Sequence, residues 1–195
     1  MKNKKGIRIG IEVAVLLLLV VWCVVPLTTA KLHVKIYFES GEGECVLYYA
    51  TTEHPVIDGQ NYVTASIEEG CADFVLEPLL YGILSDVRFD LPTIGQEYVV
   101  SRVELTSGGL IQKSYGAQDF LQPAAIVATN DITAMDPVGQ NLLVQTGADP
   151  YIVFNTDRVA ELRDAFSHYT MTKFCVAAFA VLMYLFAKKA NKEVG

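Results

Sequence analysis

Two apolar segments bracket this chain of 195 residues, and basic residues flank each segment on its outer side. The first segment, residues 13–30, holds 18 residues without a charge, and the second, residues 174–187, holds 14. Basic residues beside a membrane span favour the cytoplasmic side. The pattern therefore predicts a two-span protein of the cell membrane with both termini cytoplasmic and an extracytoplasmic central domain. The basic residues expected at the bilayer surfaces are Lys4, Lys5, Arg8, Lys173, Lys188 and Lys189.

This interpretation divides the chain into six consecutive parts. The first segment could instead be a cleaved signal peptide, because Thr28, Thr29 and Ala30 offer a small-residue cleavage site. Its length favours an uncleaved anchor, since 18 residues nearly span a bilayer core of about 30 Å. The predicted parts are a cytoplasmic tail (1–9), a first transmembrane helix (10–30), an extracytoplasmic β-domain (31–156), a helical stalk (157–169), a second transmembrane helix (170–187) and a second tail (188–195).

The region between the apolar segments is strongly acidic. Residues 31–169 hold 20 acidic and 7 basic side chains, a net charge of −13. A surface of this charge repels phosphate backbones. We therefore expect no nucleic-acid partner, and expect the lipid bilayer and either a cell-envelope glycan or a polytopic membrane protein as partners.

The central region shows the alternation of apolar and polar residues that is typical of half-buried β-strands. The pattern begins at residues 32–38 and recurs at 62–67, 86–91 and 99–105, with turn sequences between the strands. Many short strands at close spacing predict an all-β domain, a jelly-roll-like β-sandwich, flanked by two transmembrane α-helices. A short helix is expected near residues 117–121. A second helix is expected to begin after Asn155 and to continue into the second apolar segment.

The sequence contains no set of residues that favours catalysis. None of the three histidines has a metal-ligand spacing, and no known nucleophile motif is present. We therefore expect a protein that is not an enzyme, with no catalytic residue and no cofactor. Glu39, Glu42 and Glu44 are candidate Ca²⁺ ligands, although a solvated acidic turn is the simpler interpretation. Cys45 and Cys71 either form a disulfide or remain as two buried thiols.

Tyrosine gives the more suggestive signal, because eight of the ten tyrosines lie in the central domain. Flat rings beside carboxylates suit sugars, since rings stack on C–H faces and carboxylates accept hydrogen bonds from hydroxyl groups. The general preference of tyrosine for strands is the structural alternative. The candidate glycan contacts are Tyr37, Tyr62, Tyr98, Asp86, Arg88 and Asp90.

Two stretches resemble a known family, and they read DVRFDLPTIGQEYVVSRVEL (86–105) and GADPYIVF (147–154). They are similar to the β-sandwich in the first external loop of large bacterial polytopic glycosyltransferase-like proteins that use lipid-linked sugars. The catalytic loops of that family have no counterpart in this chain, so the resemblance implies no catalytic residue. It implies a non-catalytic membrane protein that is accessory to cell-envelope glycan assembly or binds glycan. The alternatives are a protein-interaction subunit of a membrane complex and a truncated fragment of a polytopic glycosyltransferase.

Overall fold

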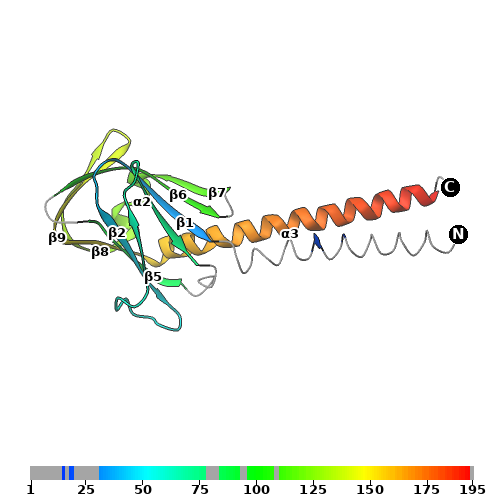
Figure 1. The fold of residues 1–195 in the computed structure, drawn as a ribbon, viewed down its shortest axis with the longest axis horizontal. Helices are drawn as coiled ribbons and strands as arrows, with labels where there is room; N and C mark the ends of the chain where they lie inside the picture. The colour runs from blue at the N-terminus through cyan, green and yellow to red at the C-terminus, as the bar shows by residue number, and fades with distance from the viewer. Residues whose placement is uncertain are drawn as a thin grey trace.

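The computed structural model describes residues 31–77, 84–92, 96–107 and 110–193, together with the isolated positions 15, 18 and 19. In this part of the chain, nine β-strands form one antiparallel sheet, and a long helix projects from it (Figure 1). The elements in chain order are β1 (Leu32–Ser40), β2 (Glu44–Thr51), β3 (Tyr62–Ser66), β4 (Cys71–Leu76), β5 (Leu84–Asp90), β6 (Glu97–Ser107), β7 (Leu110–Gly116), α2 (Ala117–Phe120), the 3₁₀ turn η2 (Pro123–Ala125), β8 (Ile126–Val138), β9 (Asn141–Phe154) and α3 (Thr156–Glu193).

One long strand, β9, holds the sheet together as a single unit. The strand order is β3-β2-β5-β9-β6-β1-β4, with β7 beside β6 and β8 beside β9. β9 pairs with β6 through residues 142–145 and with β5 through residues 151–153, so it joins two halves of the sheet. The sheet therefore curls around one core. β-strands dominate as predicted, but the predicted jelly-roll-like β-sandwich is wrong, because no division into two sheets exists among the described strands.

The two ends of the strand order, β3 and β4, meet through a tight turn. Glu68 and Cys71 exchange backbone hydrogen bonds across this turn, with N–O distances of 3.0 and 2.9 Å. Gly70 adopts a φ of 74°, and a Cβ atom at this position would lie 2.7 Å from the carbonyl oxygen of Phe38. Only glycine satisfies both conditions without strain. The turn brings β3 against β4, so the sheet nearly closes on itself.

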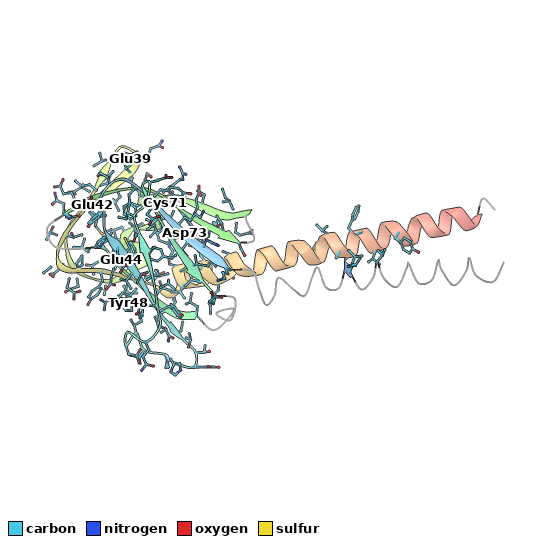
Figure 2. All side chains as sticks on the ribbon, in the orientation of Figure 1. Glu39, Glu42, Glu44, Tyr48, Cys71 and Asp73 are labelled. Carbon is cyan, nitrogen blue, oxygen red and sulfur yellow. The ribbon has the colours of Figure 1, made fainter. Side chains whose placement is uncertain are left out.

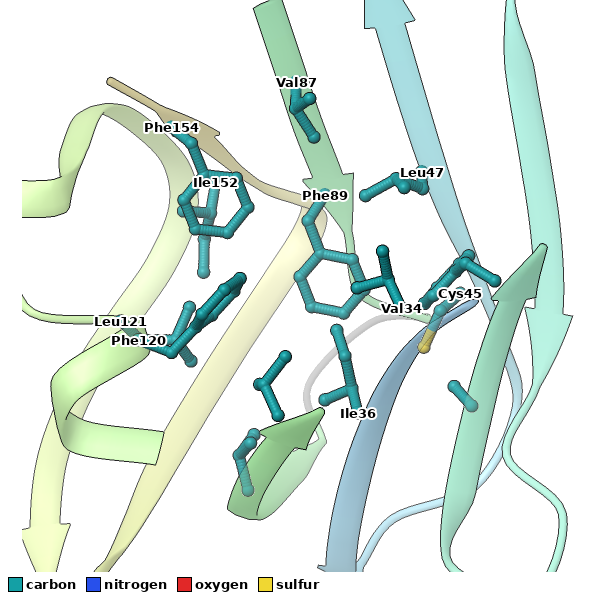
Figure 3. Close-up of a cluster of buried hydrophobic side chains, with 14 of the residues drawn as sticks. Val34, Ile36, Cys45, Leu47, Val87, Phe89, Phe120, Leu121, Ile152 and Phe154 are labelled. Atoms are coloured by element: carbon teal, nitrogen blue, oxygen red, sulfur yellow. The ribbon is translucent and has the colours of Figure 1, made fainter. Parts of the chain in front are cut away.

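The inward-facing residues of the strands fill the interior. β1 alternates buried and half-buried residues from Leu32 to Phe38, as the sequence predicts. Aromatic rings meet edge-on in the core, with centroids 5.8 Å apart for Phe74 and Phe89 and 5.2 Å apart for Phe120 and Phe154. Figure 3 shows side chains from β1, β2, β5, β9 and α2 converging on this core. The polar residues that alternate with them are therefore left on the outer face of the sheet.

The start of α3 is fixed to the sheet. Asn155 caps the helix, since its Oδ1 accepts a hydrogen bond from the Arg158 N–H at 2.8 Å. The buried Arg158 side chain pairs with Glu161, and its Nη2 donates to the Asp119 carbonyl at 2.8 Å. Its guanidinium also lies over the ring of Tyr115 in β7, 4.8 Å from the centroid. The predicted helix start is confirmed, and α3 continues without interruption away from the sheet (Figure 1).

The prediction of flanking transmembrane helices is wrong for the part of the chain that the structure describes. No helix in the described part of the chain is both long and apolar enough to cross a membrane. In α3 the uncharged run between Lys173 and Lys188 has 14 residues, which is about 21 Å of helix, whereas a span needs about 20 residues. This finding overturns the predicted span at 170–187 and the predicted cell-membrane localisation. The predicted span at 10–30 lies outside the described residues, except for three isolated positions. The same holds for the basic residues before it, Lys4, Lys5 and Arg8.

Candidate functional site

Three tyrosines and one arginine line up on the outer face of β3, β2, β5 and β9. Tyr48 in β2 lies opposite Tyr62 in β3 on one side and opposite Arg88 in β5 on the other. Tyr151 in β9 lies opposite Asp90, the next outward residue after Arg88. Residues two apart in a strand share a face, so all of these side chains point away from the core. We call Tyr62, Tyr48, Arg88 and Tyr151 the tyrosine–arginine row.

The flat groups of the row lie in contact with one another. The ring centroids of Tyr48 and Tyr62 are 5.7 Å apart, and the ring planes are tilted by 43°. The Cζ atom of Arg88 lies 3.9 Å from the ring centroid of Tyr151 and 5.2 Å from that of Tyr48. The guanidinium is therefore held between two rings. Tyr62, at the end of the row, is 53% exposed and offers its ring to solvent.

A carboxylate on the same strand fixes the plane of the central guanidinium. Arg88 donates from Nε to Oδ1 of Asp90 at 2.7 Å and from Nη2 to Oδ2 at 2.5 Å. Burial raises the pKa of Asp90 even though these hydrogen bonds act to lower it. The hydrogen bonds to Asp90 raise the pKa of Arg88, so its charge is retained but paired. Asp86 lies half-buried on the same face, two residues before Arg88, and adds a further carboxylate.

The structure separates the six predicted glycan contacts. Four of them lie on the face that carries the row: Tyr62, Asp86, Arg88 and Asp90. The sequence analysis did not include Tyr48 and Tyr151, which also lie on this face. The signal for Tyr48 was present, because it alternates with the inward-facing residues of β2. Tyr37 lies in the other half of the sheet, on β1.

Tyr98 cannot contact a glycan, because its side chain is buried in the core. Its hydroxyl donates to the carbonyl oxygen of Pro92 at 2.6 Å, and burial raises its pKa to about 12. The prediction for Tyr98 is therefore wrong. The cause is an irregularity of register between β1 and β6, after which the inward-facing residues of β6 change from even to odd positions.

The predicted calcium ligands do not converge. Glu39 is the exposed residue before the end of β1, Glu42 lies in the following turn and Glu44 begins β2, and Figure 2 shows them at separate places. Within the described ranges, no group of three or more His, Cys, Asp or Glu side chains is placed to hold a metal ion. The structure therefore gives no support to a Ca²⁺ site at these residues.

The predicted disulfide is also absent, because Cys45 and Cys71 are both free thiols. Cys45 points into the core, where burial raises its pKa to about 12. Burial likewise raises the pKa of Cys71, which lies on β4 opposite Tyr37. The alternative of two buried thiols is confirmed for Cys45 only, because Cys71 is a free thiol that is half-buried. The raised pKa values keep both thiols protonated at neutral pH.

Comparisons of the chain with models of protein families, with characterised proteins and with solved structures find no match. The resemblance to glycosyltransferase-like membrane proteins therefore stays a prediction. The tyrosine–arginine row has to be interpreted from its own geometry and charge.

Proposed function

We propose that this protein binds glycans through the tyrosine–arginine row and does not change them chemically. The observation that supports this function is the position of Arg88 between two tyrosine rings, with Tyr62 extending the row to an exposed ring. Sugars stack their C–H faces on such flat groups. Because the row crosses four neighbouring strands, it suits an oligosaccharide better than a single sugar.

The charges around the row indicate which sugars it favours. The Asp86 carboxylate lies on the same face as the rings and can accept hydrogen bonds from hydroxyl groups, whereas both carboxylate oxygens of Asp90 already accept from Arg88. Arg88 is already paired with Asp90, so it offers little attraction to an anionic ligand. The net charge of −13 over residues 31–169 repels uronic acids and phosphorylated glycans. The proposed ligand is therefore a neutral oligosaccharide or one that carries amino groups.

The test is an NMR titration of the full chain with cellotetraose, with chitotetraose and with tetragalacturonic acid. We expect the two neutral tetrasaccharides to shift the amide signals of β2, β3 and β5, and the acidic one to leave them unchanged. Tyr62→Ala is expected to weaken binding about fivefold to tenfold, because it removes the most exposed ring of the row. Tyr62→Trp should retain or strengthen binding.

The matched control is Tyr184→Ala, which removes an exposed tyrosine from α3, far from the row. This variant should bind like the unaltered protein. A folded protein that shows no shifts on these strands with any of the three saccharides at millimolar concentration would refute the proposal. Equal losses in the Tyr62→Ala and Tyr184→Ala variants would also refute it.

A further inference from the structure

A half-open hollow of about 460 Å³ lies between the β8–β9 hairpin and the segment that joins α2 to η2. Its walls are mainly apolar side chains from both elements. Those that matter here are Leu121, Pro123, Ile126, Met135, Pro137 and Leu142. Leu121 and Leu142 are buried and form its floor, whereas Ile126 and Met135 are only half-buried and border its mouth. This volume lies in the range of ligand pockets and leaves room for a large apolar side chain.

The hollow is held open by defined contacts. The Nε2 atom of Gln118 in α2 donates to the carbonyl oxygens of Gly139 and Asn141, at 2.8 and 2.9 Å. These two hydrogen bonds tie the tip of the β8–β9 hairpin to α2. Because the walls belong to elements that are bonded to each other, a ligand would find the hollow already formed.

The exposed charged side chains on the segments that line the hollow are acidic, whereas Arg158, which is bonded to α2 at the Asp119 carbonyl, is buried and paired with Glu161. Residues 114–157, which include every residue that lines it, hold five aspartates and no Lys, Arg or His. Asp136 lies on β8 between two lining residues, and Asp119 follows Gln118 in α2; both are exposed. An anionic ligand such as a fatty acid is therefore repelled, and basic groups on either side of an apolar anchor are attracted.

β8 is the outer strand at this place, but its backbone cannot form a regular ladder with a partner. The register of β8 with β9 shifts between Asn130 and Ile132 and again between Ile132 and Ala134, and Pro137 has no N–H group. Affinity at this site must therefore come from a side chain in the hollow and from charge. Backbone pairing along the edge contributes little.

We propose that the hollow docks a peptide segment of a partner protein that places one large apolar side chain between basic residues. This surface differs from the tyrosine–arginine row in its residues and in its ligand. Glycan binding at the row and peptide docking at the hollow therefore succeed or fail independently.

The test is an NMR titration of the full chain with three amidated pentapeptides. The probe is Lys-Ala-Trp-Ala-Lys; the second peptide has alanine in place of tryptophan, and the third has glutamate in place of both lysines. We expect the probe to shift the amide signals of Leu121, Met135 and Leu142. The other two peptides should bind at least about tenfold more weakly, because each lacks one of the two required features.

Two variants on the same strand locate the binding. Thr129 lines the hollow and is exposed, so Thr129→Trp is expected to fill the hollow and to weaken binding of the probe by at least about tenfold. Val127 is exposed on β8 and is not one of the lining residues, so Val127→Trp should leave binding unchanged. Equal binding of the lysine and glutamate peptides would overturn the proposal, as would full binding by a folded Thr129→Trp variant. Shifts confined to other strands would show docking elsewhere and would also overturn it.

Discussion

Arg88 and Arg102 occupy similar chemical settings in the two halves of the sheet, but only one of them belongs to an extended surface. Each guanidinium carbon lies 3.9 Å from the centroid of a tyrosine ring, and each side chain pairs with a carboxylate two residues further on. The side chain of Arg88 is 27% exposed and lies between two rings. That of Arg102 is 51% exposed and covers only the ring of Tyr37.

The neighbouring strands explain this difference. β5 lies between β2 and β9, and both of these strands place a tyrosine beside Arg88. β6 places Arg102 between Tyr37 of β1 and Gly116 of β7, and the glycine has no side chain to offer. An arginine that is paired with a carboxylate on a sheet is thus part of a row of flat side chains only where both neighbouring strands place an aromatic ring beside it.

The largest expected effect is on stability, when each arginine is removed in turn. Arg88→Ala leaves Asp90 half-buried without its bidentate partner, so we expect a loss of about 2 kcal/mol in the free energy of unfolding. Arg102→Ala should cost less than about 1 kcal/mol, because Glu104 keeps the hydrogen bond from the Tyr37 hydroxyl at 2.9 Å. Urea denaturation of the two variants measures both values. Equal losses would mean that Asp90 is no more destabilised by losing Arg88 than Glu104 is by losing Arg102.

The sequence predicts those features of the two arginines that depend on the alternation of residues within one strand. Arg88 and Asp90 alternate with the apolar residues Val87 and Phe89, so their exposure on one face follows from the period of a strand. The position of Tyr98 does not follow from the period of a single strand. An irregularity of register between β1 and β6 makes the even-numbered residues face inward at the start of β6 and the odd-numbered residues face inward further on. Alternation within one strand carries no information about such an irregularity.

The sequence analysis also missed the strand β8 and the pairing of β9 with both β5 and β6. No residue of β8 is buried, and Asp131 in its middle adopts a φ of 47°, so β8 lacks the regular alternation of a half-buried strand. β9 joins β5 and β6 because it is long enough to pair with both, and this choice of partners is a tertiary property. The meeting of Arg88 with Tyr151 depends on that pairing, so the row could not be assembled from the sequence.

A smaller effect is expected in the dependence of stability on pH. Burial raises the pKa of Asp90 above its ordinary value of 3.8 in the folded protein, although Arg88 acts to lower it. The folded state therefore binds this proton more tightly than the unfolded state does. The stability from this group is fully present below 3.8 and is lost as the pH rises through the folded-state pKa.

Asp90→Asn should remove that contribution, so the difference in the free energy of unfolding between variant and unaltered protein changes with pH across this window. Urea denaturation at several pH values from about 3 to 7 measures the change. NMR titration of the Asp90 carboxyl group provides a direct reading of its pKa. A midpoint below 3.8 would show that the pairing with Arg88 outweighs burial, and the sign of the pH effect would then reverse.

The smallest effect comes from building the missing ring beside Arg102. Gly116 lies opposite Arg102 with extended backbone angles (φ −63°, ψ 152°), and a Cβ atom there would meet only Asp119 Oδ2, at an ordinary distance of 3.6 Å. Gly116→Tyr should therefore fit and place a second ring over the guanidinium, with a gain of about 0.5 kcal/mol. Gly116→Ala is the control, because it adds the Cβ atom without the ring. If the tyrosine variant is no more stable than the alanine variant, a second ring is insufficient, and the order of the row around Arg88 depends on the bidentate hydrogen bonds to Asp90.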